Sequence, residues 1–131
     1  MTSTICEALD KTFISNNTIE LIGYATQDIQ FLGYLEMLKW TPRVELVKFV
    51  KVGLTDQNFN LLLCFIVKAE RVTSVVVSNN HLTDESMSTL LNFCRLHQQL
   101  KCVYMGRNYI NQQRCKPLLQ ELKQMGTMVY I

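Results

Sequence analysis

The sequence predicts an α/β fold made of repeated strand–helix units, and two observations carry this prediction. Apolar residues recur at the same places of a 28-residue frame, most clearly at 44–49, 72–77 and 100–105. In each frame a short stretch carries apolar residues two places apart, at the fourth and sixth places, as a strand with one inward face does, and a stretch with apolar residues at helical spacing follows it. A unit of this kind buries its apolar face only against neighbours, so the units must stack.

Residues 4–14 are predicted to form a helix ahead of the first unit. Thr4 and Glu7 have the spacing of a capping box, in which each side chain bonds a backbone N–H group of the other residue. We therefore expect residues 1–15 to form an N-terminal capping helix over the first strand.

Four repeats and a last strand follow this cap. They are expected at residues 16–43, 44–71, 72–99 and 100–127, with the final strand at 128–131. The continuing period puts Met128 at the first place of that strand's frame and Ile131 at the fourth. Together these segments assign residues 1–131 to a single domain.

The helix of each repeat is expected to begin near an aspartate. Asp28, Asp56 and Asp84 are 28 residues apart, and Gln112 takes this place in the last repeat. A carboxylate there can accept hydrogen bonds from free N–H groups of the first turn and complements the helix dipole. The apolar helix faces expected from the spacing are Leu32 and Leu35; Phe59, Leu62, Leu63 and Ile66; Met87, Leu90, Leu91 and Cys94; and Cys115, Leu118, Leu119 and Leu122.

These patterns resemble a known repeat family. Residues 72–84 read V-x-x-V-x-V-x-x-N-x-L-T-D, and the apolar and asparagine places recur at 100–110. With the helix that follows, they resemble the leucine-rich repeat, and the 28-residue length resembles its ribonuclease-inhibitor-like subclass. The resemblance covers residues 16–131. It implies a short leucine-rich-repeat solenoid with parallel strands on the concave face and helices on the convex face.

The resemblance also implies a structural asparagine ladder. In that family the asparagine at the ninth place hydrogen-bonds backbone groups of the turn after the strand, and Asn80 and Asn108 stand at this place. Val52 and Tyr24 occupy it in the two earlier repeats, so the ladder is expected to be interrupted toward the N-terminus.

Composition excludes several classes of protein. The chain has 131 residues, of which 48% are hydrophobic and 18% charged, and this excludes a disordered chain. The net charge of +2 does not by itself predict nucleic-acid binding. The longest apolar run, residues 61–67, is far shorter than the roughly 20 residues of a transmembrane helix. No membrane insertion is expected.

The cysteines indicate a reducing compartment. There are five, an odd number, with no C-x-x-C pair and no signal peptide ahead of them, so we expect an intracellular, cytoplasmic protein. Cys94 stands at a core place and should be a small buried side chain. Cys102 is the thiol expected to be exposed.

No arrangement of residues predicts catalysis or a bound cofactor or metal. Glycine-rich phosphate loops are absent, paired carboxylates for acid–base chemistry are not evident, and His81 and His97 are expected in loops. We therefore predict a non-enzymatic protein–protein interaction module, a small scaffold or accessory subunit of a larger assembly.

Two surfaces are candidates for this interaction. Outward places of the strands and the position after them would form a partner-binding concave face with apolar and basic residues, a composition common at interfaces. The last strand would present an uncovered edge to a partner or to a second copy. The face comprises Leu46, Lys48, Val50, Lys51, Val76, Tyr104 and Arg107, and the edge comprises Met128, Val129, Tyr130 and Ile131. The basic residues favour a partner with an acidic surface.

Two alternatives remain open. A nucleic-acid-binding subunit could use the basic C-terminal repeat, because cations beside an aromatic ring suit single strands. Its candidate residues are Lys48, Lys51, Lys101, Tyr104 and Arg107. A small thiol- or histidine-dependent enzyme would need Cys102 or a histidine with an orienting partner.

Overall fold

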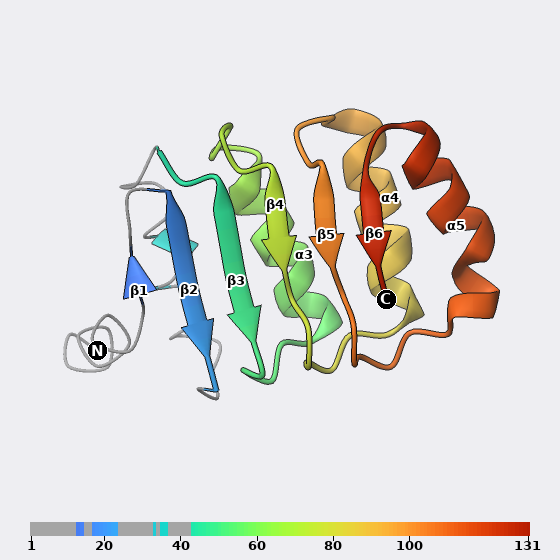
Figure 1. Cartoon of the computed structure of the whole chain (residues 1–131), viewed down its shortest axis with the longest axis horizontal. Helices are drawn as coiled ribbons and strands as arrows, with labels where there is room; N and C mark the ends of the chain where they lie inside the picture. The colour runs from blue at the N-terminus through green and yellow to red at the C-terminus, as the bar shows by residue number, and fades with distance from the viewer. Residues whose placement is uncertain (1–12, 15–16, 24–32, 34, 37–42) are drawn as a thin grey trace.

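The computed structural model describes residues 13–14, 17–23, 33, 35–36 and 43–131. Figure 1 shows one sheet with its strands in chain order and a helix after each of three strands. The elements are β1 (Phe13–Ile14), β2 (Thr18–Ile22), β3 (Leu46–Val50), α3 (Asp56–Ile66), β4 (Ser74–Val76), α4 (Asp84–Leu96), β5 (Cys102–Tyr104), α5 (Gln112–Gln124) and β6 (Met128–Tyr130).

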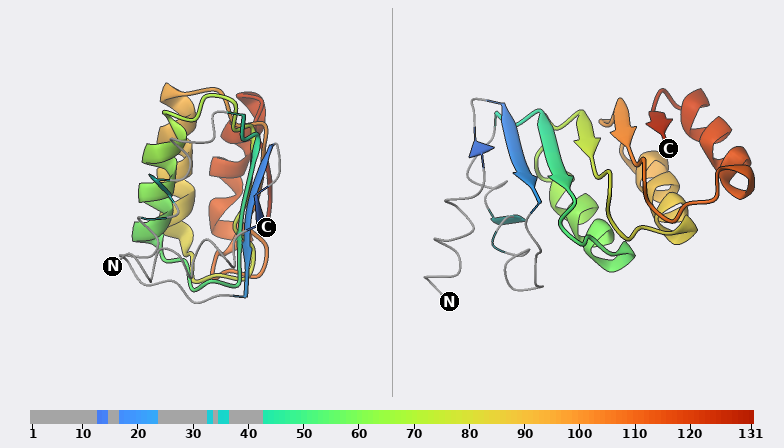
Figure 2. Two further views of the ribbon diagram at one scale, coloured as in Figure 1. Left: turned by 90° about the vertical axis from the view of Figure 1, so that its left-hand side faces the viewer. Right: turned by 60° about the horizontal axis from the view of Figure 1, so that its bottom comes forward.

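Strands β2 to β6 are parallel, and their register repeats the period of the sequence. Thr18, Leu46, Ser74 and Cys102 are aligned across four strands and stand 28 residues apart. Helices α3, α4 and α5 lie along one face of the sheet (Figure 2). The predicted α/β architecture of parallel strands with helices on one side is therefore confirmed where the structure describes the chain.

The core lies between the sheet and the helices. Its strand residues are those at the fourth and sixth places, such as Val47 and Phe49 of β3, which are fully buried. The predicted apolar faces of α3 and α4 are buried as well. On α5, Cys115 and Leu122 are buried, whereas Leu118 and Leu119 are only half-buried. Helix α5 contacts α4 on one side and has no described helix on the other.

Side chains at the helix starts hydrogen-bond both their own first turn and the following repeat. Thr55, Thr83 and Asn111 are the N-cap residues, and each side-chain oxygen accepts an N–H of its own first turn. The aspartates expected to serve the first turn bond the following repeat instead. Asp56 accepts the backbone N–H of Thr83 at 2.8 Å and its hydroxyl at 2.6 Å.

Asp84 repeats this connection one unit later. It accepts the backbone N–H of Asn111 at 2.7 Å and the Nε of Arg114 at 2.8 Å. The 28-residue aspartates therefore join one helix start to the next, and Asp28 lies outside the described residues.

The predicted N-terminal helix is wrong at its last two residues. Phe13 and Ile14 form β1, which pairs antiparallel with β2 at Glu20 and Ile19. An antiparallel partner bonds backbone groups that the edge of β2 would otherwise leave free. Residues 1–12, the remainder of the predicted helix, lie outside the described part of the chain.

The predicted phase of the last strand is also wrong, by two residues. Met128, Val129 and Tyr130 align with Cys102, Val103 and Tyr104. Val129 thus takes the fourth place, which had been assigned to Ile131. The cause is a shorter connection, because residues 125–127 join α5 to β6, whereas residues 97–101 join α4 to β5. Gly126, at φ +92°, makes the tight turn possible.

Candidate functional site

The face of the sheet opposite the helices carries five of the seven residues predicted to bind a partner. Leu46, Lys48, Val50 and Val76 are half-buried on it, and Tyr104 is 41% exposed. We call this surface the sheet face. Its other outward side chains in β2, β4, β5 and β6 are Thr18, Glu20, Ile22, Ser74, Cys102, Met128 and Tyr130.

Two tyrosines form the most exposed aromatic patch of the sheet face. The rings of Tyr104 and Tyr130 are stacked with centroids 4.8 Å apart and planes 14° apart. The shorter last repeat produces this pair, because it brings Tyr130 level with Tyr104. The predicted phase placed Tyr130 two positions away from the residue level with Tyr104. Both tyrosines were therefore predicted to point outward, but not to contact each other.

The charged part of the sheet face lies toward the other end of the sheet. The Lys48 ammonium lies 3.8 Å from the Glu20 carboxylate on the neighbouring strand. Both side chains remain partly exposed to solvent, so the pair contributes little to stability. It does place a carboxylate beside one of the predicted basic residues.

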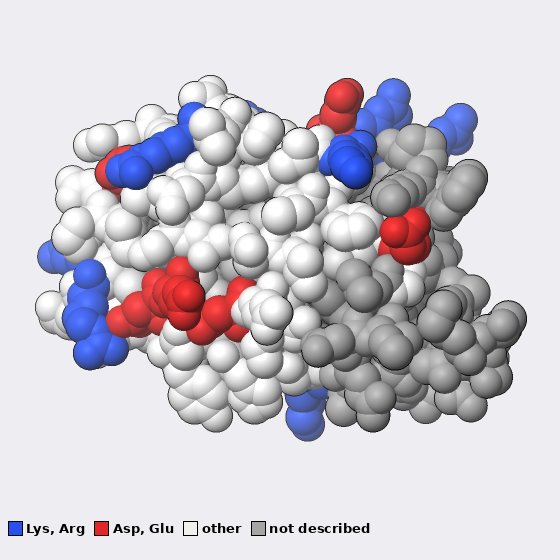
Figure 3. All heavy atoms as spheres, turned by 180° about the vertical axis from the view of Figure 1, so that it is seen from behind, with Lys and Arg blue, Asp and Glu red and all other residues white. Residues whose placement is uncertain are grey.

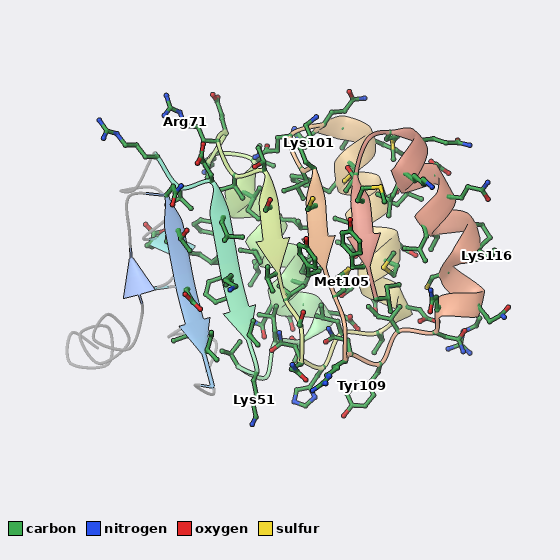
Figure 4. All side chains as sticks on the ribbon, viewed as in Figure 1. Lys51, Arg71, Lys101, Met105, Tyr109 and Lys116 are labelled. Atoms are coloured by element: carbon green, nitrogen blue, oxygen red, sulfur yellow. The ribbon has the colours of Figure 1, made fainter. Side chains whose placement is uncertain are left out.

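Lys51 and Arg107 are not on the sheet face but in the turns at the ends of β3 and β5. Both have left-handed backbone conformations, with φ 58° and 57°, as does Asn79 at the same place of the intervening repeat. Figure 4 shows Lys51 at this edge of the sheet, pointing away from it. The seven predicted residues therefore divide between a face and an edge.

The same edge carries a second aromatic contact. The His81 and Tyr109 rings lie with centroids 6.0 Å apart and planes 7° apart, and Tyr109 is 69% exposed. Both residues stand at the tenth place of their repeats. His81 lies in a loop, as its place in the repeat predicts, but its contact with Tyr109 could not be predicted from the sequence.

Asn80 and Asn108 hydrogen-bond the turns that follow the strands. The Asn80 side-chain oxygen accepts the N–H groups of Val52 and Leu54 at 3.1 and 3.0 Å. Its amide nitrogen donates to the Phe49 carbonyl of the preceding repeat at 2.7 Å and to the Val77 carbonyl of its own at 2.9 Å.

Asn108 makes the equivalent bonds one repeat later. Its oxygen accepts from Asn80 and Leu82 at 3.1 and 3.0 Å, and its nitrogen donates to Val77 and Met105. Val52, at this place of the second repeat, is a buried core residue. Tyr24 lies outside the described residues.

The four described thiols differ in burial and in their contacts. Burial raises the pKa of Cys94, whose sulfur accepts a 3.7 Å hydrogen bond from Thr127, and burial also raises the pKa of Cys115. Among the described cysteines, Cys64 on α3 is the exposed one and Cys102 is half-buried, so the expectation for Cys102 was wrong. His97 packs against Phe93, with ring centroids 5.2 Å apart.

The helix side differs from the sheet face. Seen from behind in Figure 3, acidic side chains gather in a band below the middle of the helix layer, with basic ones toward its ends. A groove of about 330 Å³ lies between α3 and α4, lined among others by Leu63, Cys64, Phe93 and Leu96. Within the described ranges, no cluster of three or more potential metal ligands occurs.

Comparisons with known proteins show the fold. No protein-family model matches the chain, and no curated protein sequence matches it. Among solved structures it is similar to "Leiomodin-1 Actin-Binding Site 2 (ABS2)", with a TM-score of 0.75 and 10% sequence identity, covering 98% of this chain and 76% of that one. That neighbour has a leucine-rich-repeat-like fold. Among the helices described, none is long and apolar enough to cross a membrane. The chain therefore has an α/β architecture consistent with a leucine-rich-repeat-like fold.

Proposed function

We propose that this chain is a non-enzymatic protein–protein interaction module whose sheet face binds its partner. The observation that carries the proposal is the exposed Tyr104–Tyr130 stack at outward positions of β5 and β6. Tyrosine is enriched at protein interfaces because its ring offers apolar area at small entropic cost and its hydroxyl can hydrogen-bond. The half-buried Val76 and Leu46 extend the apolar surface across neighbouring strands.

The proposal includes the architecture implied by the family resemblance. The chain would be one domain, a solenoid of the ribonuclease-inhibitor-like subclass with repeats at 16–43, 44–71, 72–99 and 100–127. The sheet face would be its concave side, and residues 1–15 its cap. The 28-residue register of the parallel strands supports this arrangement. The protein would act inside the cell, because the four cysteines described are free thiols.

Charge suggests a partner with an acidic surface. Lys51 and Arg107 lie at the edge of the sheet face and, within the described residues, form no ion pair. Such charges would steer an acidic protein toward the exposed tyrosines. Because the solved structure with a similar fold is named for actin binding, actin is the first purified protein to test.

The test is a crosslinked pull-down from a native extract, with purified actin as a separate sample. The wild-type chain is compared with a Tyr104→Ser, Tyr130→Ser double variant and with Tyr109→Ser as matched control. Tyr109 is exposed but lies in the edge turn. We expect the double variant to lose the specific partner and the control to keep it. Equal capture by all three proteins would contradict binding through the sheet face.

A further inference from the structure

The turn after β5, residues 106–110, carries two backbone N–H groups whose equivalents in the two preceding repeats are hydrogen-bonded in the same way. In the second repeat, the N–H groups at the ninth and eleventh places converge on the Asn80 side-chain oxygen, at 3.1 and 3.0 Å. In the third repeat, the equivalent groups converge on the Asn108 oxygen at the same two distances. Each pair of N–H groups thus shares one oxygen acceptor.

The equivalent donors in the fourth repeat are the N–H groups of Asn108 and Ile110. No described residue accepts a hydrogen bond from either group. Asn108 is held in place by its own bonds to Val77 and Met105. By equivalence with the two earlier turns, the Asn108 and Ile110 N–H groups are placed to share one oxygen acceptor.

At the same end of the stack, α5 and β6 carry apolar side chains that are only half-buried. Leu118 and Leu119 are half-buried, whereas Leu90 and Leu91, at the same places of the third repeat, are buried. Val129 is likewise half-buried, whereas Val103, its partner on β5, is buried. Leu119, Met128 and Val129 line a hollow of about 330 Å³. We call the backbone N–H groups of Asn108 and Ile110, the Arg107 side chain and the side chains of α5 and β6 that line this hollow together the end surface.

Three cations belong to the end surface. Lys116 and Lys123 line the hollow, and Arg107 stands in the turn. None of the three forms an ion pair with a described residue. Lys123 stands 28 residues after Arg95, whose guanidinium pairs with Glu121 of the next helix at 2.7 Å. By this equivalence, we expect a polypeptide bound to the end surface to place a carboxylate beside the Lys123 ammonium.

We propose that the end surface binds an acidic segment of a partner protein, one carboxylate of which accepts both the Asn108 and Ile110 N–H groups. A carboxylate fits better than a neutral amide because charged acceptors make the stronger hydrogen bonds and Arg107 adjoins the site. The inference rests on the proposed function, protein binding, but concerns the end surface, which has Met128 in common with the sheet face.

The test is an amide ¹H–¹⁵N NMR titration of the 131-residue chain with two synthetic peptides. The first is acetyl-Val-Asp-Val-Asp-Val-amide, and the second has asparagine at both aspartate positions. We expect saturable downfield shifts of the Asn108 and Ile110 amide protons with the aspartate peptide. The asparagine peptide, or an Arg107→Gln chain, should bind about threefold or more weakly, the loss expected for an exposed charge contact.

A Tyr104→Ser chain separates this inference from the proposed function. It should bind the aspartate peptide as the wild type does. Shifts that saturate on the sheet face and spare the Asn108 and Ile110 amides would overturn the inference and leave the proposed function standing. Equal affinity for the two peptides, or no saturable shift of these amides, would also overturn it. Failure of the proposed function is seen separately, in the pull-down.

Discussion

Single polar side chains connect the repeats of this protein. Asn108 satisfies two N–H groups of the preceding turn and donates to carbonyls of both repeats. Asp56 gathers a backbone N–H and two hydroxyl groups from the start of α4. Because each of these side chains contacts groups at least 26 residues away, its loss should be felt by two repeats at once.

Replacing Asn108 with alanine should destabilise the fold by about 1–3 kcal/mol. The change removes the shared acceptor of the Asn80 and Leu82 N–H groups and leaves partly buried donors without a protein partner. Urea denaturation followed by circular dichroism measures the change. Asn92→Ala is the control, because Asn92 is an exposed residue of α4. Equal urea midpoints for the two variants would contradict the predicted role.

The Asp56 carboxylate should make stability sensitive to acid. Burial alone raises its pKa, but hydrogen bonds from Ser86 and Thr83 outweigh burial and hold the pKa below the ordinary value of 3.8. The unfolded chain therefore binds the proton first. The stabilisation from Asp56 is complete above the unfolded pKa and is lost as the pH falls through the lower folded pKa.

Urea midpoints measured from pH 6 down to pH 2.5 test this expectation. The wild-type midpoint should fall most steeply at and below about pH 4. Asp56→Asn should lower the midpoint at pH 6 and flatten the fall. Glu85→Gln, an exposed carboxylate at the start of α4, is the control. An Asp56→Asn profile parallel to the wild type would exclude this carboxylate as the cause.

At the scale of elements, the period of the sequence predicted the parallel strands and the buried faces of α3 and α4, because both depend on local apolar spacing. It did not predict β1, since two residues carry too little pattern to compete with a capping-box signal. The phase of β6 was also missed. That phase depends on the length of the turn after α5, and the only local signal for it was Gly126.

Gly126→Ala should destabilise the last repeat through the backbone alone. Gly126 has φ +92°, and a Cβ there would meet nothing within 4 Å. The expected cost is about 1–2 kcal/mol, that of an L-residue held in a left-handed conformation. Gly106→Ala is the matched control, because its φ lies outside this region and its added Cβ would be in ordinary contact at 3.9 Å. Thermal denaturation should rank Gly126→Ala clearly below the control.

Across the whole molecule, the contribution of each helix to the free energy of unfolding depends on how many neighbouring helices pack against it. Helix α4 lies between α3 and α5, whereas α5 contacts only α4 among the described helices. The sequence could not distinguish these environments, because Leu91 and Leu119 occupy the same place in equivalent apolar stripes. Which side chains form the partner-binding site was likewise only partly predictable. Outward direction follows from alternation, but the Tyr104–Tyr130 contact and the position of Lys51 and Arg107 depend on register and turn conformation.

Two equivalent leucines measure this difference. Leu91→Ala should cost about 3 kcal/mol, because Leu91 is 3% exposed in a packed core. Leu119→Ala should cost less than about half as much, since Leu119 is already half-buried. Urea denaturation of both variants provides the comparison, and equal losses would show that the end of the stack is packed as tightly as its interior.

The connection from α5 to β6 is two residues shorter than the one from α4 to β5. This difference shows which changes in connection length the architecture can accept. A strand repeats its direction every two residues, so shortening the connection by two moved Tyr130 along the sheet and kept it facing away from the helices. Deleting one residue from 125–127 would instead turn Met128 and Tyr130 toward the helices and Val129 toward solvent. Insertions and deletions between helix and strand in this protein should therefore be tolerated in even steps and rejected in odd ones.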